Sequence, residues 1–293
     1  MFAAREAGAQ TPAFAFSGAR SIFWFHMTTA SPPLGTRRFG ETSRRDFWWV
    51  QPTVVFVVLS AFVLYTTWAA LQGAHYRFGP YLSPLYSPEL IGNSGHALFG
   101  PFPSWWPAWL PATPALLILW MPGGFRLTCY YYRGAYYKAF WADPPNCTVG
   151  EPRKVYLGEQ SLPLILQNVH RYFLYLALGF IVVLSWDVWE ALWFTDQATG
   201  VRSFGIGVGT LVLAVNVVLL GGYTLGCHSL RHLVGGGLDL LAGRPVRFLS
   251  YRCVSCLNRA HMRWAWTSLV WVAFSDVYVR LCSMGIWTDW RIL

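Results

Sequence analysis

The chain has 293 residues, of which 55% are hydrophobic and 12% are charged, and its formal net charge is +9. Soluble domains carry about 25% charged residues, so this composition excludes an intrinsically disordered chain and a water-soluble enzyme. It is typical of a protein that lies in a lipid bilayer. In such a protein the positions of Lys and Arg report the membrane topology first.

The first segment in chain order is a polar arm, residues 1–46. Residues 1–26 show neither the long apolar core nor the cleavage site of a signal peptide. We interpret them as an over-extended start or an arm without assigned function. The membrane domain is then expected to cover residues 47–293.

Five apolar segments are each long enough to cross a bilayer core of about 30 Å as a helix. We expect these helices at about 47–71, 105–124, 170–195, 204–226 and 264–288. Trp and Tyr gather near their ends, as they do at membrane–water interfaces. The sequence therefore predicts an all-α integral membrane protein, a five-helix bundle.

Basic residues set the orientation of the predicted bundle. Eighteen of the 22 Lys and Arg fall in the arm and in residues 125–171 and 227–263, which an odd number of spans places on one side. Arg77, Arg202 and Arg291 fall on the other side. Because basic loops stay in the cytoplasm, we expect a cytoplasmic N-terminus and an external C-terminus in the cell inner (plasma) membrane.

Nine Cys and His side chains collect on the predicted cytoplasmic side. They are Cys129, Cys147, His170, Cys227, His228, His232, Cys253, Cys256 and His261. A reducing compartment disfavours disulfides, so these residues are candidate metal ligands or packing residues. Cys253 and Cys256 have the C-x-x-C spacing of a metal chelate, but we interpret them as packing in the loop before the fifth helix.

Three interpretations of this face remain open from the residues alone. A single haem b needs two His from facing helices at similar depth, which His170 with His228 or His232 would supply. Two Cys and two His suit a Rieske-type [2Fe–2S] cluster, although the Cys-x-His boxes of soluble Rieske domains are absent. The third interpretation is a non-redox transporter subunit, for which the expected internal repeats are not evident.

Four runs of sequence carry a family resemblance. They are Phe125-Arg-Leu-Thr-Cys129-Tyr-Tyr-Tyr-Arg133-Gly-Ala-Tyr-Tyr-Lys138-Ala-Phe-Trp141, Pro144-Pro-Asn-Cys147, Gln167-Asn-Val-His170-Arg-Tyr-Phe173 and Gly226-Cys-His228-Ser-Leu-Arg231-His232-Leu. Residues 105–290 resemble the cytochrome b-type membrane anchor of bacterial succinate dehydrogenase, respiratory complex II. Within that family they are similar to the five-helix class with a membrane-embedded Rieske-type [2Fe–2S] cluster.

The resemblance implies an enzyme subunit with no succinate chemistry of its own. Cys129 and Cys147 would ligate one iron, and His170 and His228 the other, with His232 as an alternative to His228. Electrons would pass from the flavoprotein subunit through the iron–sulfur subunit to this cluster, and then to menaquinone or ubiquinone. The implied partners are these two subunits, the quinone and membrane lipid, and no nucleic acid is expected.

Polar and aromatic side chains near the proposed cluster are candidates to bind the quinone. A quinone pocket needs apolar walls and a few donors aimed at the carbonyl oxygens. The candidates are Tyr131, Arg133, Arg231, His232 and Trp266.

Four acidic or basic residues fall in the interior of the predicted spans, where a charge is costly and therefore suggests a function. They are Asp187, Glu190, Asp276 and Arg280. Asp276 and Arg280 share one helix face because they are four residues apart. We interpret the four as a buried ion-pair network between the third and fifth helices, with a proton path to the outer face as the alternative.

Overall fold

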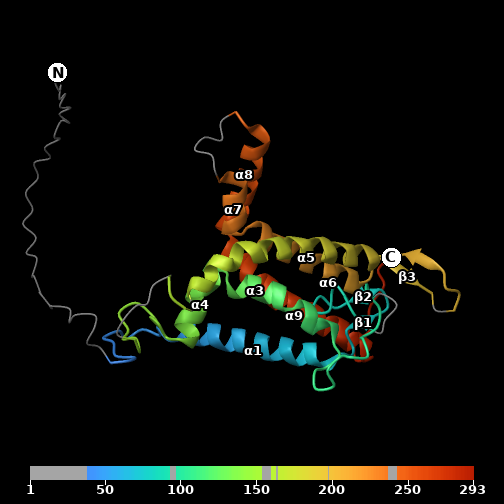
Figure 1. Ribbon diagram of the computed structural model, residues 1–293, viewed down its shortest axis with the longest axis horizontal. Coiled ribbons are helices and arrows are strands. Elements are labelled where there is room, and N and C mark those ends of the chain that lie inside the picture. Colours follow the sequence, from blue (N-terminus) through green and yellow to red (C-terminus); the bar gives the residue numbers. More distant parts are fainter. Residues whose placement is uncertain (1–37, 93–96, 154–159, 163, 197, 237–242) are drawn as a thin grey trace, which may run out of the picture. The chain divides into compact units, whose positions relative to one another are not determined.

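The computed structural model describes residues 38–92, 97–153, 160–162, 164–196, 198–236 and 243–293. The expectations for residues 1–26, and for the arm as far as residue 37, lie outside this described part. Within it the structure is mainly helical, as predicted, with two short β-hairpins in addition (Figure 1).

Four long helices dominate the described part. They are α1 Val50–Gln72, α5 His170–Glu190, α6 Val208–Leu225 and α9 His261–Ser283. Their ends have local causes. Gly73 closes α1 with a φ of +60°, a left-handed conformation that favours glycine. At the start of α6 the Gly207 N–H donates a hydrogen bond of 3.2 Å to Thr210 Oγ1.

Three segments of the described residues are long and apolar enough to cross a membrane. They are Val50–Gln72, Leu164–Glu190 and Val208–Leu225. The second combines the 3-10 helix η1 Leu164–Val169 with α5. α1 buries little of its surface and leaves Val54, Val63 and Leu64 exposed. An apolar surface of this kind marks contact with lipid.

The second predicted span has a different form from the one expected. Residues 105–113 lie outside any helix, and two short helices follow, α2 Pro114–Ile118 and α3 Trp120–Leu127. Pro107 and Pro111 explain the late start, because proline lacks a backbone N–H and clashes with the preceding helical turn. Pro114 is tolerated because it lies in the first turn of α2.

One end of the helices carries the two β-hairpins, and we call it the hairpin end. β1 Arg77–Phe78 pairs with β2 Tyr81–Leu82 after α1 ends. β3 Trp193–Thr195 pairs with β4 Arg202–Phe204 between α5 and α6. This second hairpin turns the chain so that α6 packs back against α5.

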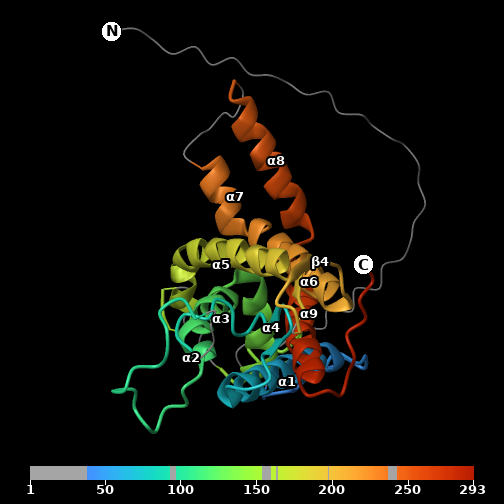
Figure 2. The same ribbon diagram turned by 90° about the vertical axis from the view of Figure 1, so that its right-hand side faces the viewer.

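The opposite end holds three shorter helices, and we call it the α4 end. They are α4 Tyr130–Phe140, α7 His228–Gly235 and α8 Pro245–Arg259. The sequence predicted non-membrane loops here, so these helices are a correction, including the helix that carries Cys253 and Cys256. α7 and α8 pack against each other (Figure 2). The largest buried cluster lies at this end, around Phe125, Tyr132 and Tyr223.

Candidate functional site

Two Cys and two His side chains are buried at the α4 end. They are Cys129, His170, Cys227 and His261, with exposed fractions of 1%, 7%, 1% and 1%. Each stands where a helix begins. Cys129 and Cys227 precede α4 and α7 with an extended backbone, at ψ 128° and 141°. His170 and His261 are the first residues of α5 and α9. Four helix starts therefore deliver the four side chains to one part of the core.

The four side chains contact each other as two Cys–His pairs. His170 Nε2 lies 3.0 Å from Cys227 Sγ, and His261 Nε2 lies 3.7 Å from Cys129 Sγ. Both thiols belong to the same buried cluster. Among the described residues, no group of three or more His, Cys, Asp or Glu side chains converges on a single point. The two pairs are thus neighbours without forming a closed mononuclear site.

Thr128 fixes which nitrogen of His170 carries the proton. The Thr128 hydroxyl donates to the Gly124 carbonyl at 2.7 Å, so its oxygen is free to accept from His170 Nδ1 at 2.9 Å. The hydrogen-bond network therefore assigns the Nδ1–H tautomer. Burial raises the pKa of the Cys227 thiol to about 11. Nε2 of His170 then presents its lone pair to Cys227, as a metal-ligating imidazole does.

Aromatic rings and one guanidinium surround the two pairs. Phe125 stacks on His170 with ring centroids 4.6 Å apart, and Tyr223 stacks on His261 at 4.9 Å. The Arg126 guanidinium lies 4.6 Å from the Tyr223 ring centroid. Arg126 also donates to the Ser268 hydroxyl at 2.7 Å. The half-buried Arg126 cation is thereby separated from His261 by the ring of Tyr223.

Two apolar cavities meet at Arg126. The larger has a volume of about 550 Å³ and is lined by α1, α3, α4 and η1, with Arg126, Tyr132 and Tyr136 as polar walls. The smaller, of about 160 Å³, lies between α1, α3, α5 and α6, and its lining includes Arg126, Phe125 and Tyr223. A cavity with mainly apolar walls and few polar groups is the usual form of a small-molecule site.

Three predicted ligands lie outside the buried set. Cys147 is exposed in the loop after α4, where its carbonyl accepts a hydrogen bond of 3.1 Å from Arg44 Nη1. His228 and His232 lie on the outer side of α7, and their Nε2 atoms lie 2.9 Å apart. The structure therefore does not bring either histidine to face His170, as a bis-His haem would require.

Cys227 and His261 are buried beside Cys129 and His170, whereas Cys147 and His228 are exposed. Cys227 and His261 were among the nine Cys and His of the predicted cytoplasmic face, but their spacing did not distinguish them. The missing signal is structural: each stands at a helix start that the sequence did not predict at that residue.

The predicted quinone residues divide into two groups. Tyr131 and Trp266 lie next to the site, with ring centroids 4.7 Å from His261 and 5.5 Å from Tyr132. The other three are turned to other partners. Arg133 contacts Gln167 at 3.4 Å, Arg231 donates to Tyr251 at 2.8 Å, and His232 pairs with His228. Arg126, which was not predicted, is a basic residue that lines both cavities.

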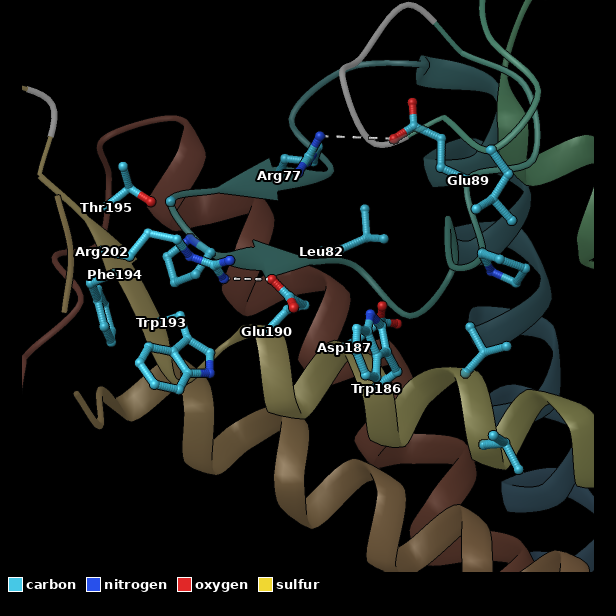
Figure 3. A pocket seen from close by; sticks show the side chains of 16 residues that line it. Arg77, Leu82, Glu89, Trp186, Asp187, Glu190, Trp193, Phe194, Thr195 and Arg202 are labelled. Atoms are coloured by element: carbon cyan, nitrogen blue, oxygen red, sulfur yellow. Dashed lines mark hydrogen bonds and ion pairs between the residues drawn. The ribbon is translucent and has the colours of Figure 1, made fainter. Parts of the chain in front are cut away.

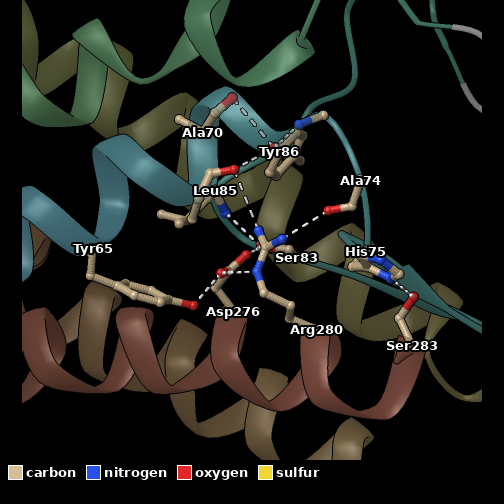
Figure 4. Close-up of polar contacts among 12 residues, drawn as sticks. Tyr65, Ala70, Ala74, His75, Ser83, Leu85, Tyr86, Asp276, Arg280 and Ser283 are labelled. Carbon is tan, nitrogen blue, oxygen red and sulfur yellow. Dashed lines mark hydrogen bonds and ion pairs between the residues drawn. The ribbon is translucent and has the colours of Figure 1, made fainter. Parts of the chain in front are cut away.

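Asp276 and Arg280 form a buried ion pair on α9 with a separation of 3.2 Å. Figure 4 shows that both side chains face α1 and the turn after it. The Tyr65 and Ser83 hydroxyls donate to Asp276, and Arg280 Nη1 donates to the Ala74 carbonyl at 2.9 Å. The pair therefore ties α9 to α1 and to the segment that follows β2.

Asp187 and Glu190 have other partners than the expected ones. The Ser87 hydroxyl donates to Asp187, and Glu190 pairs with Arg202 at 2.7 Å. In place of the expected network between α5 and α9, the hairpin end has two separate groups of contacts. Asp276 and Arg280 form one, and Asp187 and Glu190 with their own partners form the other.

Comparison with known proteins gives a family and a solved structure that the chain is similar to. The family model, described as actinobacterial succinate dehydrogenase subunit SdhC, matches residues 50–285. The solved structure is the Mycobacterium smegmatis Sdh1 complex in the apo form, with 40% sequence identity and a TM-score of 0.77. That match covers 90% of this chain and 98% of the other. No curated protein sequence matches the chain.

Proposed function

This chain belongs to the family of actinobacterial succinate dehydrogenase subunit SdhC, and from that premise we propose that it relays electrons to a membrane quinone through a Rieske-type [2Fe–2S] cluster. It is a membrane subunit of the enzyme complex. Succinate chemistry belongs to the other subunits. The electrons would reach this chain from the iron–sulfur subunit, which receives them from the flavoprotein subunit.

The observation that supports the cluster is the buried set of two thiols and two imidazoles at the α4 end. We propose Cys129 and Cys227 as the thiolate ligands and His170 and His261 as the imidazole ligands. This donor set is that of a Rieske-type cluster, which transfers one electron at a time when it is bound. We do not include Cys147 and His228 among the proposed ligands, because both side chains are exposed.

The surroundings of the four residues fit such a group. The Thr128 hydroxyl oxygen accepts a hydrogen bond from His170 Nδ1–H, which leaves the Nε2 lone pair available to a metal. His261 Nδ1 is buried and makes no hydrogen bond of normal geometry among the described residues. A buried polar atom without a partner is costly, and coordination of a metal by this Nδ1 lone pair would remove that cost.

The quinone is proposed to occupy the cavity of about 550 Å³. Its apolar walls accept the ring and the first part of the tail. Arg126 supplies a donor on the side nearest the Cys and His pairs. Its Nη1 donates to the Tyr132 hydroxyl at 3.0 Å, and that hydroxyl donates in turn to the Ala265 carbonyl at 2.6 Å. Arg126 would stabilise negative charge on a quinone oxygen, and Tyr132 would hold the Arg126 guanidinium in place.

Docking of the iron–sulfur subunit is proposed at the α4 end. α7 and α8 carry four Arg and no acidic residue between His228 and Gly235 and between Pro245 and Arg259. A basic surface of this kind suits an acidic partner surface. The same bias in Lys and Arg supports a cytoplasmic position for this end, and hence for the cluster.

Matched Cys and His variants of the intact complex test the proposed ligands. Cys227→Ser and His261→Ala are expected to lose the cluster, measured as iron and acid-labile sulfide per complex, and with it quinone reduction. Succinate oxidation with a soluble artificial acceptor should remain, because that acceptor takes electrons before the anchor. Cys147→Ser and His228→Ala serve as controls and should keep both activities.

The reverse pattern would refute the ligand assignment. If Cys147→Ser and His228→Ala lost the iron while Cys227→Ser and His261→Ala kept it, the ligands predicted from the sequence would be correct. If all four variants kept the iron of the wild-type complex and full quinone reduction, the chain would not carry the cluster.

A further inference from the structure

The hairpin end holds a large cavity that the proposed electron relay does not use. Its volume is about 830 Å³, and it lies between α5 and the segment around β1 and β2, with the β3–β4 hairpin beside it (Figure 3). One wall consists of Val182, Val183 and Trp186 on α5. Val182 and Trp186 are 70% and 62% exposed, so the cavity opens toward the surface that a membrane would cover.

The opposite wall and the rim of the cavity carry charges of both signs. Arg77 lies 3.9 Å from Glu89, and Arg202 lies 2.7 Å from Glu190 (Figure 3). Asp187 adds a third carboxylate, which accepts a hydrogen bond from Ser87. Two guanidinium groups and three carboxylates therefore surround one apolar hollow.

We propose that this cavity binds a phospholipid whose head group carries both a phosphodiester and a primary ammonium, as phosphatidylethanolamine does. The acyl chains would lie along Val182, Val183 and Trp186. Arg202 and Arg77 would bind the phosphate, and the carboxylates of Asp187 and Glu190 would accept hydrogen bonds from the ammonium. The proposal does not depend on the cluster or on the quinone site.

The charge balance selects this head group over the other common ones. An anionic head group without an amine would meet three carboxylates, and like charges at close range are repulsive. A quaternary ammonium has no N–H to donate to Asp187 or Glu190. Arg202 has spare capacity for phosphate, because a guanidinium carries five N–H donors and the contact with Glu190 involves one terminal nitrogen, Nη2.

The position of the cavity also disfavours a quinone that takes part in the electron relay. α5 runs from His170 at the α4 end to Glu190 at the cavity, a length of about 30 Å at 1.5 Å per residue. Among the residues that the structure describes, no Cys or His lines the cavity. An amphiphile that anchors the hairpin end in lipid fits the place better than a redox substrate.

Lipid binding to the purified intact complex tests the proposal. The complex is stripped in detergent and mixed with phosphatidylethanolamine, phosphatidylcholine or phosphatidylglycerol at equal concentrations, and bound lipid is counted by native mass spectrometry. Wild-type protein should retain phosphatidylethanolamine at least about tenfold better than the other two, which corresponds to one charged hydrogen bond. Glu190→Gln and Asp187→Asn should remove this preference. Arg202→Gln should weaken the binding of all three lipids.

Arg291→Gln is the matched control, because Arg291 lies at the same end and bonds to Ser203, Phe204 and Leu293 outside the cavity. It should bind lipid as wild type does. Equal retention of the three lipids would overturn the proposal. Unchanged preference in Glu190→Gln would overturn it as well, because that side chain is 35% exposed and its replacement leaves the fold intact. Displacement of the phosphatidylethanolamine by a quinone would assign the cavity to the quinone instead.

Discussion

Replacing Arg280 by Ala should destabilise the protein strongly, because it leaves a buried carboxylate without its cation. The side chains of Arg280 and Asp276 are 4% and 0% exposed, and their closest atoms are 3.2 Å apart. The variant also frees the Ala74 carbonyl, which accepts from Arg280 at 2.9 Å. Removing one partner of a buried ion pair costs about 3–5 kcal/mol. Tyr65 and Ser83 would still donate to Asp276, which favours the lower half of that range.

The measurement is the free energy of unfolding of the purified protein in mixed micelles, from titration with sodium dodecyl sulfate. Arg202→Ala is the comparison, because it removes an ion pair whose side chains are 53% and 35% exposed. Exposed pairs contribute less than about 1 kcal/mol. Equal losses in the two variants would refute the reasoning, since burial would then make no difference to the cost of an unpaired charge.

Three further predictions concern packing and the site. Gly222→Ala should lower the free energy of unfolding by about 1–3 kcal/mol, because the added Cβ would lie 2.7 Å from the Trp264 ring. In the same assay Gly221→Ala should be neutral or stabilising, because its Cβ would meet open space. Thr128→Val removes the acceptor of the His170 Nδ1 proton and should lower cluster retention during chelator challenge by roughly 10–100-fold, with Thr128→Ser close to wild type. Arg126→Gln should slow quinone reduction by at least about tenfold while succinate oxidation with the soluble acceptor stays unchanged; equal loss of both activities would contradict a quinone role for Arg126.

The membrane class and the helical runs could be predicted from the sequence because they depend on local composition. α1, α5 and α6 coincide with apolar runs, and a membrane-spanning helix requires only sufficient length and hydrophobicity. The span expected at 105–124 fails at Pro107 and Pro111, where the covalent limits of proline outweigh the apolar pattern. α8 was missed because its Arg-rich, weakly apolar sequence resembles a loop when its packing partner α7 is unknown.

The sequence predicts that Cys and His gather at one face, but not which of these side chains are buried together. The sequence pointed to Cys and His at one face, and Cys129 and His170 are indeed buried there. The start of α7 turns the Cys227 side chain inward and that of the neighbouring His228 outward. The sequence pattern alone does not reveal this difference. His261 is buried while Cys253 and Cys256 are exposed, because α8 ends at Arg259 and α9 begins with His261. The sequence did not predict this helix boundary.

Electron paramagnetic resonance of the intact complex, reduced stepwise with succinate and then with a stronger reductant, tests the central claim most directly. We expect a signal of a [2Fe–2S] cluster with couplings to two imidazole nitrogens. One coupling should disappear or change in His261→Cys, whereas Cys147→Ser should leave the spectrum unchanged. Haem absorption bands with two nitrogen ligands on a haem iron, and no such cluster signal, would contradict it.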